Sequence, residues 1–182
     1  MIIIALGVAV WISAHFFRFR APNMNAVGKV AVAVLVLASI SLMVVGFRGA
    51  QFIPVWQPPA FMGHINNVLM IFAFYVFGAS AAKGEKAWLG TKIRRPQLVA
   101  ISIWAVAHLL ANGDLAAIIL FGSMLIWALI SIQVLNASQG QWDIPPRAGA
   151  VREIRLVVIT VVLFLFVAAV HSALGVSPFG GV

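Results

Sequence analysis

Cysteine is absent from this chain, and charged residues of both signs are scarce. Without cysteine the protein has no disulfide framework, no thiolate metal site and no thiol redox pair. Asp, Glu, Lys and Arg together make up only 9% of the 182 residues, whereas a typical soluble domain carries roughly a quarter. Hydrophobic residues make up 63% and the mean hydropathy is +1.09. The composition therefore excludes a soluble domain and indicates an integral membrane protein.

Acidic residues are fewer than basic ones: the chain has four Asp and Glu and twelve Lys and Arg, which gives a net charge of +8. The basic residues lie in the segments between apolar runs. That distribution is the membrane-orientation signal, so we expect no nucleic-acid partner. The length allows a single domain over residues 1–182. No basic leader precedes the first apolar run, which we expect to be a retained spanning helix.

Six apolar runs approach the length of about 20 residues that a membrane-spanning helix needs. They cover residues 2–17, 28–47, 63–82, 97–111, 115–136 and 155–174. The first and fourth runs are short, as is common for helices that their neighbours bury. The predicted fold class is all-α, a polytopic membrane helix bundle with about six transmembrane helices.

The basic residues divide between the loops in a way that predicts the orientation of the helices. Eleven of the twelve lie in alternate loops, and only Arg48 lies on the other side. The eleven are Arg18, Arg20, Lys29, Lys83, Lys86, Lys92, Arg94, Arg95, Arg147, Arg152 and Arg155. The basic side of a membrane protein faces the cytoplasm, so we predict that both termini lie outside.

All four histidines lie inside or at the edge of apolar runs: His15, His64, His108 and His171. Burial favours the neutral ring, whose lone pair is what a metal or a haem iron needs. A single membrane histidine often does no more than form a hydrogen bond between helices. Four in six helices favour a cofactor, and haem b, held by two histidines on different helices, is the first candidate. Zinc or copper is a weaker one.

Aromatic and polar side chains accompany two of these histidines at helical spacing. Trp104, His108 and Asn112 recur every four residues, which places them on one helix face. Trp11 and His15 are likewise four residues apart in the first run. Each predicted face therefore presents an imidazole beside an indole ring.

Asn112, Gly113 and Asp114 separate the fourth and fifth apolar runs. Asn-Gly and Gly-Asp pairs are typical of turns, so we predict a tight hairpin with positive φ at Gly113. Asp114 is predicted to cap the N-terminus of the fifth helix. Trp127 lies in a stripe with Ser123 and Ser131, which favours helix packing over a ligand site.

The blocks around this turn resemble the NnrU family of bacterial membrane proteins. The resemblance lies in Arg95-Pro96-Gln97-Leu98, Trp104-Ala105, the block from His108-Leu109-Leu110 through Asn112-Gly113-Asp114-Leu115, and Leu120-Phe121-Gly122. His15 followed by Arg18 or Arg20 is a second, less specific match. The family usually has a histidine where this chain has Arg95, so no role of that histidine transfers.

The resemblance implies a multi-pass protein of the bacterial inner membrane with a link to nitrite and nitric oxide metabolism. The family is also similar to plant 15-cis-ζ-carotene isomerase, a membrane haem b protein with histidine axial ligands. Mapped onto this sequence, the implied iron ligands are His15 and His108. Trp11 and Trp104 would then wall the pocket, and Asn112 would donate a hydrogen bond beside it. By depth in the membrane, His64 and His171 form a better-matched alternative pair.

Two functions remain open from the sequence. The first is a haem b membrane protein with a redox or cis–trans isomerase-like role, whose partners are membrane lipid and a hydrophobic small-molecule substrate. The second is a cofactor-free small transporter or accessory subunit, in which the histidines pack helices or relay protons. Whether the chain is an enzyme is left open. A Soret band in the purified protein separates the two functions.

The predicted orientation can be tested with reporter fusions. Fusions after Lys86 and after Arg147 should report the cytoplasm, and a fusion after Arg48 should report the periplasm, because positive charge is retained on the cytoplasmic side. A periplasmic signal at Lys86 would overturn the predicted topology.

Overall fold

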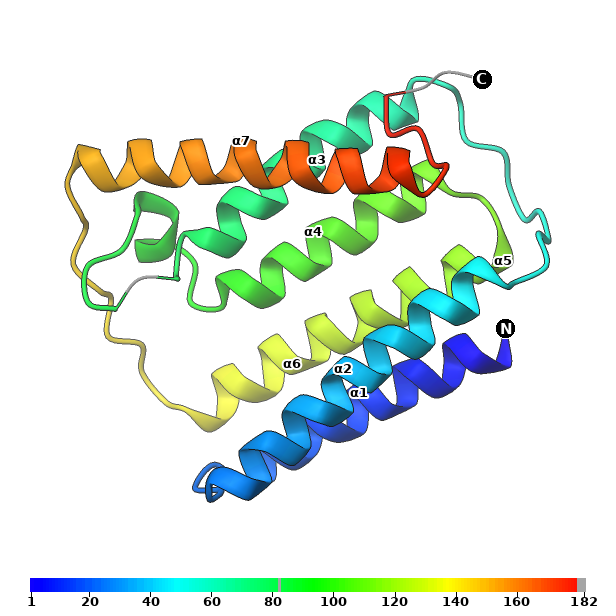
Figure 1. Cartoon of the computed structure of the whole chain (residues 1–182). Helices are drawn as coiled ribbons and strands as arrows, with labels where there is room; N and C mark the ends of the chain where they lie inside the picture. The colour runs from blue at the N-terminus through cyan, green and yellow to red at the C-terminus, as the bar shows by residue number, and fades with distance from the viewer. Residues whose placement is uncertain (82, 180–182) are drawn as a thin grey trace. The chain divides into compact units, whose positions relative to one another are not determined.

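The computed structural model describes residues 1–81 and 83–179, and the named elements in this part are all helical (Figure 1). Five long helices are uninterrupted α-helices: α1 (Ile2–Arg20), α2 (Ala26–Arg48), α3 (Met62–Gly78), α4 (Pro96–Ala111) and α7 (Ala150–Ala173). A sixth continuous helix contains α5 (Leu115–Ala117), the π-helical segment η2 (Ile118–Gly122) and α6 (Ser123–Ser138). A short 3₁₀ helix, η1 (Trp88–Thr91), lies between α3 and α4. The predicted all-α class is confirmed.

Four of these helices are long and apolar enough to cross a membrane: α1, α2, the helix Leu115–Ser138, and α7. α3 and α4 are apolar but shorter, with 17 and 16 residues. The protein is therefore a polytopic helical membrane bundle. α1 continues through Arg20, beyond its predicted end at residue 17. α3 ends at Gly78, earlier than predicted, and the predicted endpoint Ala82 lies outside the described residues.

Side-chain caps set the first turns of two helices. The Asn25 side chain accepts a hydrogen bond from the Gly28 backbone N–H at 2.8 Å. The Asp114 carboxylate accepts one from the Ala117 N–H at 3.1 Å. Each bond satisfies one of the backbone donors that a helix start leaves without an intrahelical partner. The predicted capping role of Asp114 is confirmed.

The chain forms two compact units that alternate along the sequence. Unit 1 comprises Met1–Gln57 and Asn112–Trp127, and unit 2 comprises Pro58–Ala111 and Ala128–Val182. The single domain predicted from the length stays a prediction.

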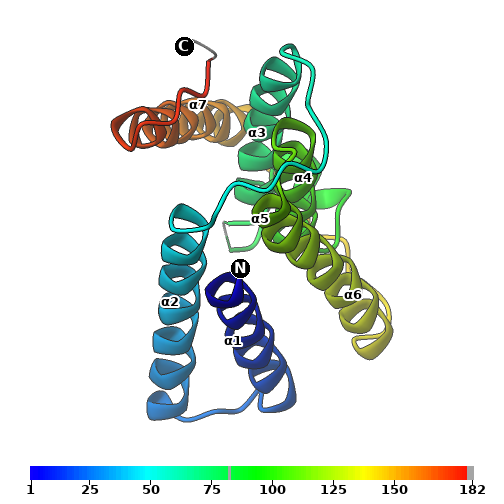
Figure 2. The same ribbon diagram turned by 90° about the vertical axis from the view of Figure 1, so that its right-hand side faces the viewer.

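In unit 1, α1 and α2 run side by side, and glycines allow the close approach of the two helices (Figure 2). A Cβ atom added to Gly46 would lie 2.8 Å from the Ile4 backbone nitrogen. A Cβ atom added to Gly7 would lie 2.9 Å from the Met43 backbone nitrogen. Backbone atoms cannot move aside as a flexible side chain can. Small residues at such crossings are the usual means by which membrane helices pack.

The loop after α2 pairs with the segment that precedes α5, also within unit 1. The Gly113 carbonyl accepts hydrogen bonds from the backbone N–H groups of Val55 (2.8 Å) and Trp56 (3.0 Å), and the Leu115 N–H donates to the Ile53 carbonyl (2.9 Å). The described glycines with positive φ do not include Gly113. The predicted positive φ is therefore wrong, because this segment is held by pairing with another loop instead of by a tight turn of its own.

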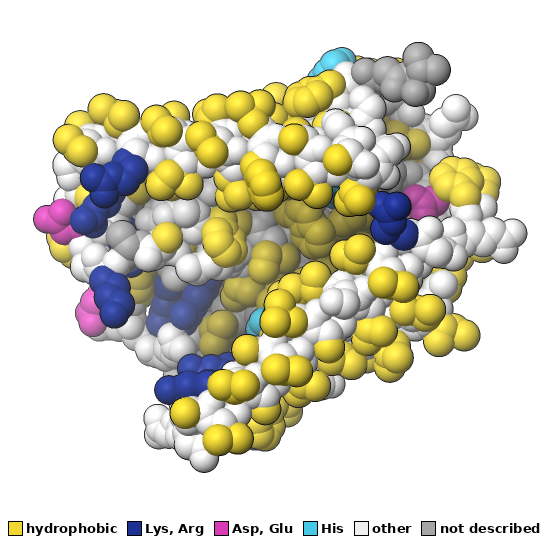
Figure 3. All heavy atoms as spheres, viewed as in Figure 1, with side chains coloured by type: hydrophobic (Ala, Val, Ile, Leu, Met, Phe, Trp, Pro, Cys, Tyr) yellow, Lys and Arg dark blue, Asp and Glu magenta, His cyan; other side chains and the backbone are white. Residues whose placement is uncertain are grey.

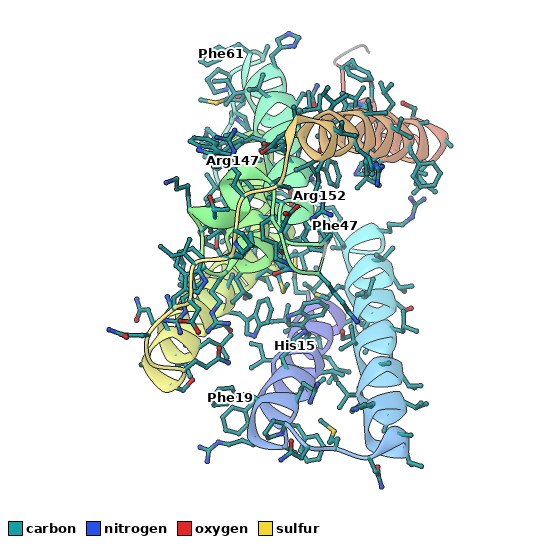
Figure 4. All side chains as sticks on the ribbon, turned by 90° about the vertical axis from the view of Figure 1, so that its left-hand side faces the viewer. His15, Phe19, Phe47, Phe61, Arg147 and Arg152 are labelled. Atoms are coloured by element: carbon teal, nitrogen blue, oxygen red, sulfur yellow. The ribbon has the colours of Figure 1, made fainter. Side chains whose placement is uncertain are left out.

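In unit 2, α3 packs against both α4 and α7. The two basic loops at one end of these helices are joined: the Lys86 N–H donates to the Pro146 carbonyl at 2.9 Å, and the Ala148 N–H donates to the Lys86 carbonyl at 2.8 Å. Figure 3 shows hydrophobic side chains along α7 and basic side chains gathered near its start, and Figure 4 shows Arg147 and Arg152 there. Two loops predicted to be cytoplasmic thus meet at one end of unit 2.

Glu153, in the first turn of α7, connects three segments of unit 2. Its carboxylate accepts a hydrogen bond from the Tyr75 hydroxyl of α3 at 2.9 Å. It also accepts a short hydrogen bond from the backbone N–H of Trp88, at the start of η1. Hydrogen bonds to a charged acceptor are among the stronger ones. Glu153 therefore holds η1 against α3 and α7.

Arg95, directly before α4, also connects segments that are far apart in the sequence. Its guanidinium donates hydrogen bonds to the Leu135 carbonyl, the Asn136 side chain and the Gln139 side chain, which lie at the end of α6. Burial, and then the neighbouring Arg94, lower the pKa of Arg95 from its usual value. A guanidinium remains charged in spite of such a shift, and it caps helix carbonyls that lack intrahelical partners.

The close helix crossing in unit 1 predicts that an alanine at Gly46 destabilises the protein, whereas an alanine at an open glycine elsewhere does not. Gly46→Ala should lower the thermal unfolding midpoint in detergent, because overpacking costs about 1–3 kcal/mol and exceeds a gain in helix propensity of about 1 kcal/mol. Gly63→Ala, in α3, is the matched control, since an added Cβ there meets nothing within 4 Å. It should leave the midpoint unchanged or raise it. Equal midpoints for Gly46→Ala and the parent would contradict the close crossing.

Loss of the Glu153 carboxylate should loosen the loop that carries η1. Glu153→Ala leaves the Tyr75 and Trp88 donors without their acceptor, at a cost of about 1–3 kcal/mol. Trypsin should then cleave after Lys86 faster than in the parent. Asp143→Ala removes an exposed carboxylate and should leave the cleavage rate unchanged. Equal rates for the two variants would show that the contacts of Glu153 do not hold the loop.

Candidate functional site

His15 lies on α1 with its ring fixed by its own helix (Figure 4). The Nδ1 atom lies 2.9 Å from the carbonyl oxygen of Trp11, one turn earlier. A carbonyl can only accept a hydrogen bond, so Nδ1 carries the proton. In the neutral ring the lone pair is then on Nε2, the nitrogen that points away from the backbone. This is the tautomer that coordinates a metal through Nε2.

An aromatic cluster surrounds His15 within unit 1. The ring centroid of His15 lies 4.2 Å from that of Trp11 and 4.9 Å from that of Trp127. The two indoles meet edge to face at 5.3 Å. The buried indole nitrogen of Trp11 has no hydrogen-bond partner among the described residues. The cluster therefore combines an oriented imidazole with a buried indole N–H donor.

Trp127 is a member of this cluster that sequence reasoning assigned to helix packing alone. The spacing of four between Ser123, Trp127 and Ser131 predicts that they share one helix face. It does not predict that this face contacts His15. The π-helical segment η2 precedes Trp127 and packs against α1. Such segments are frequent at functional sites, because the extra residue shifts the face that follows.

His108, on α4 in unit 2, repeats the arrangement of His15. Its Nδ1 atom lies 2.9 Å from the Trp104 carbonyl oxygen, and the two rings are 5.4 Å apart and tilted by 54°. The predicted pairing of Trp104 and His108 on one helix face is thereby confirmed. α4 ends at Ala111, so Asn112 follows the helix directly, and its predicted place on this face stays a prediction.

His171, near the end of α7, is the third histidine of this type. Its Nδ1 atom lies 2.8 Å from the Val167 carbonyl oxygen. Like His108, it belongs to unit 2. His64, by contrast, is exposed in the first turn of α3. Sequence reasoning paired His171 with His64 by depth, and no interaction between these two rings is described.

The structure thus places the predicted site residues in two local groups. Trp11 and His15 lie together in unit 1, and Trp104 and His108 lie together in unit 2. The ligand pair His15 and His108 draws one histidine from each unit and stays a prediction. Among the described residues no three or more histidine or acidic side chains form a metal-binding group. A haem needs fewer ligands from the protein than such a metal ion, since its iron takes only axial ligands from the chain.

Comparison with known proteins agrees with this arrangement of apolar helices. No curated protein and no solved structure matches the chain. A family model described as NnrU protein matches residues 3–178, nearly the whole sequence. The match includes both histidine–tryptophan groups and all the long helices, and on this evidence the chain belongs to the NnrU family.

Proposed function

We propose that this NnrU-type membrane protein binds haem b, with His108 as one axial ligand. The observation that carries the proposal is the hydrogen bond from His108 Nδ1 to the Trp104 carbonyl. Histidines that bind metals almost always donate their other ring N–H to a carbonyl, a carboxylate or water, which fixes the ring and raises its basicity. His108 already has this arrangement in the last turn of an apolar helix.

The surroundings of His108 suit a large apolar ring. Ala105 and Ala107, on the same helix, are fully buried, and the Trp104 indole lies beside the imidazole. Apolar surroundings of this kind exclude water, which favours the neutral ring. When bound, haem b supplies redox chemistry or a site for a small ligand at its iron. The residues of α4 hold and orient the imidazole.

Two histidines are candidates for the second axial position. His15 is the one that the family resemblance implies, and its ring has the same Nδ1–carbonyl bond as His108. His171 also has this bond, and it lies in the same unit as His108. His15 is the proposed ligand and His171 is the alternative partner of His108. The pair His64 and His171, predicted from depth in the membrane, stays a prediction.

In the proposed site the Trp11 indole N–H is a donor for a polar group of the cofactor or of a substrate. It lies next to His15 and has no partner among the described residues. The biological role that we propose is redox or cis–trans isomerisation chemistry in the inner membrane, with a link to nitrite and nitric oxide metabolism. The family resemblance supports this role.

The competing function is a cofactor-free transporter or accessory subunit. The same Nδ1–carbonyl bonds are compatible with it. A histidine that only packs between helices can also donate to the carbonyl four residues earlier. In that case the three rings satisfy their Nδ1–H groups within their own helices and carry no iron. The two functions differ in whether the rings bind a metal, which absorption spectra report directly.

Absorption spectra of single histidine variants test the ligands. The parent, expressed with adequate haem supply, should show a Soret band. His108→Ala should lose haem or change it from six-coordinate low-spin to five-coordinate high-spin, because alanine removes the imidazole that bonds the iron. His15→Ala should do the same. His64→Ala is the control and should leave the spectrum intact, since its ring is exposed at a helix start.

The outcome for His171→Ala identifies the second ligand. A parental spectrum in this variant with a changed one in His15→Ala supports the pair His15 and His108. The reverse result supports His108 with His171. If the parent binds no haem, or if all four variants match it, the haem proposal is wrong and the packing function stands.

A further inference from the structure

A groove in unit 1 lies on the part of α1 that also carries His15, but His15 does not line it. This groove of about 710 Å³ lies along α1, where α2 contributes one residue. Its lining is apolar except for a serine and, at one end, an arginine. The lining residues are Ala9, Val10, Ser13, Ala14, Phe16, Phe17, Arg20 and Leu35. A channel of this composition suits a hydrocarbon chain.

The length of the groove matches one leaflet of a bilayer. Ala9 and Arg20 are eleven residues apart on α1, which corresponds to about 16 Å at 1.5 Å per residue. The hydrocarbon core of a bilayer is about 30 Å thick, so one leaflet contributes about 15 Å. A single acyl chain therefore extends from the Arg20 end of the groove to the middle of the membrane.

Arg20 gives this end of the groove a positive charge. Its guanidinium lies over the Phe16 ring, 5.0 Å from the centroid, and this contact holds the charge next to the apolar lining. Asp114 is the only carboxylate in the sequence of unit 1, and it caps α5. The neighbouring Arg18 donates to the Pro22 carbonyl at 2.9 Å. Arg20 thus has no acidic counter-ion within its own unit.

We propose that this groove binds an anionic phospholipid, with one acyl chain along α1 and the phosphate on Arg20. A guanidinium pairs with phosphate through two parallel hydrogen bonds. A net negative headgroup is favoured over a zwitterionic one, because the basic end of unit 1 carries no acid to balance it. None of the lining residues is a histidine, so lipid binding in the groove does not require haem.

Photocrosslinking in lipid nanodiscs tests the proposal. The probe is phosphatidylglycerol with a diazirine in its acyl chain, compared with the same probe on phosphatidylcholine. In the full-length protein, phosphatidylglycerol should label the α1 segment 9–17 several-fold more than phosphatidylcholine does. Unlabelled phosphatidylglycerol should compete with this labelling. Arg20→Gln should reduce it about fivefold, the equivalent of roughly 1 kcal/mol per basic residue at a membrane surface.

Two further variants separate the headgroup contact from the groove. Arg48→Gln removes the basic residue at the end of α2 and should leave the labelling of segment 9–17 unchanged. Ser13→Phe fills the groove and should reduce labelling by both probes. Thermal unfolding in detergent confirms that each variant is folded. Equal labelling of the parent by both headgroups, or no effect of Arg20→Gln, overturns the proposal. Displacement by a neutral isoprenoid but not by phosphatidylglycerol also overturns it and assigns the groove to an apolar small molecule.

Discussion

Every backbone N–H and C=O group inside a hydrocarbon layer needs a partner within the protein, and this requirement governs the structure. The long helices satisfy it along their length, and the irregular segments satisfy it by pairing with one another. The Gly113 carbonyl accepts from the loop after α2, and beyond the apolar spans Lys86 pairs with the segment around Arg147. Helix carbonyls also accept hydrogen bonds from half-buried imidazoles, because His15, His108 and His171 each donate Nδ1–H to the carbonyl one turn earlier. One constraint thus fixes both the fold and the tautomers of its candidate ligands.

Local sequence patterns predicted the features that depend on neighbouring residues. Apolar runs predicted the helices, Asp114 was identified as a cap, and a spacing of four placed Trp104 beside His108. The positive φ of Gly113 was predicted wrongly, since Asn-Gly-Asp favours a turn only when no other segment offers hydrogen bonds. The contacts of Glu153 and Arg95 link residues about 40 to 80 positions apart. The periodicity of apolar residues along the sequence does not predict such long-range pairs.

The candidate site shows the same division between local and distant information. The period of four placed an indole beside each imidazole, yet the hydrogen bond that fixes the ring depends on the side-chain rotamer. Trp127 joins His15 from a helix more than a hundred residues later, so its stripe alone indicated packing. His171 belongs to the same unit as His108, since α3 packs against both α4 and α7. A depth estimate along separate helices could not show which helices pack together.

The alternation of the two units along the chain has a consequence for synthesis. Unit 1 is complete only when Asn112–Trp127 has been made, whereas its first part ends at Gln57. The further 70 residues from Pro58 to Trp127 take roughly 4–14 s to translate at 5–20 residues per second. Until they are made, His15 lacks Trp127, one of its aromatic neighbours. The N-terminal third of the chain therefore cannot complete unit 1 alone.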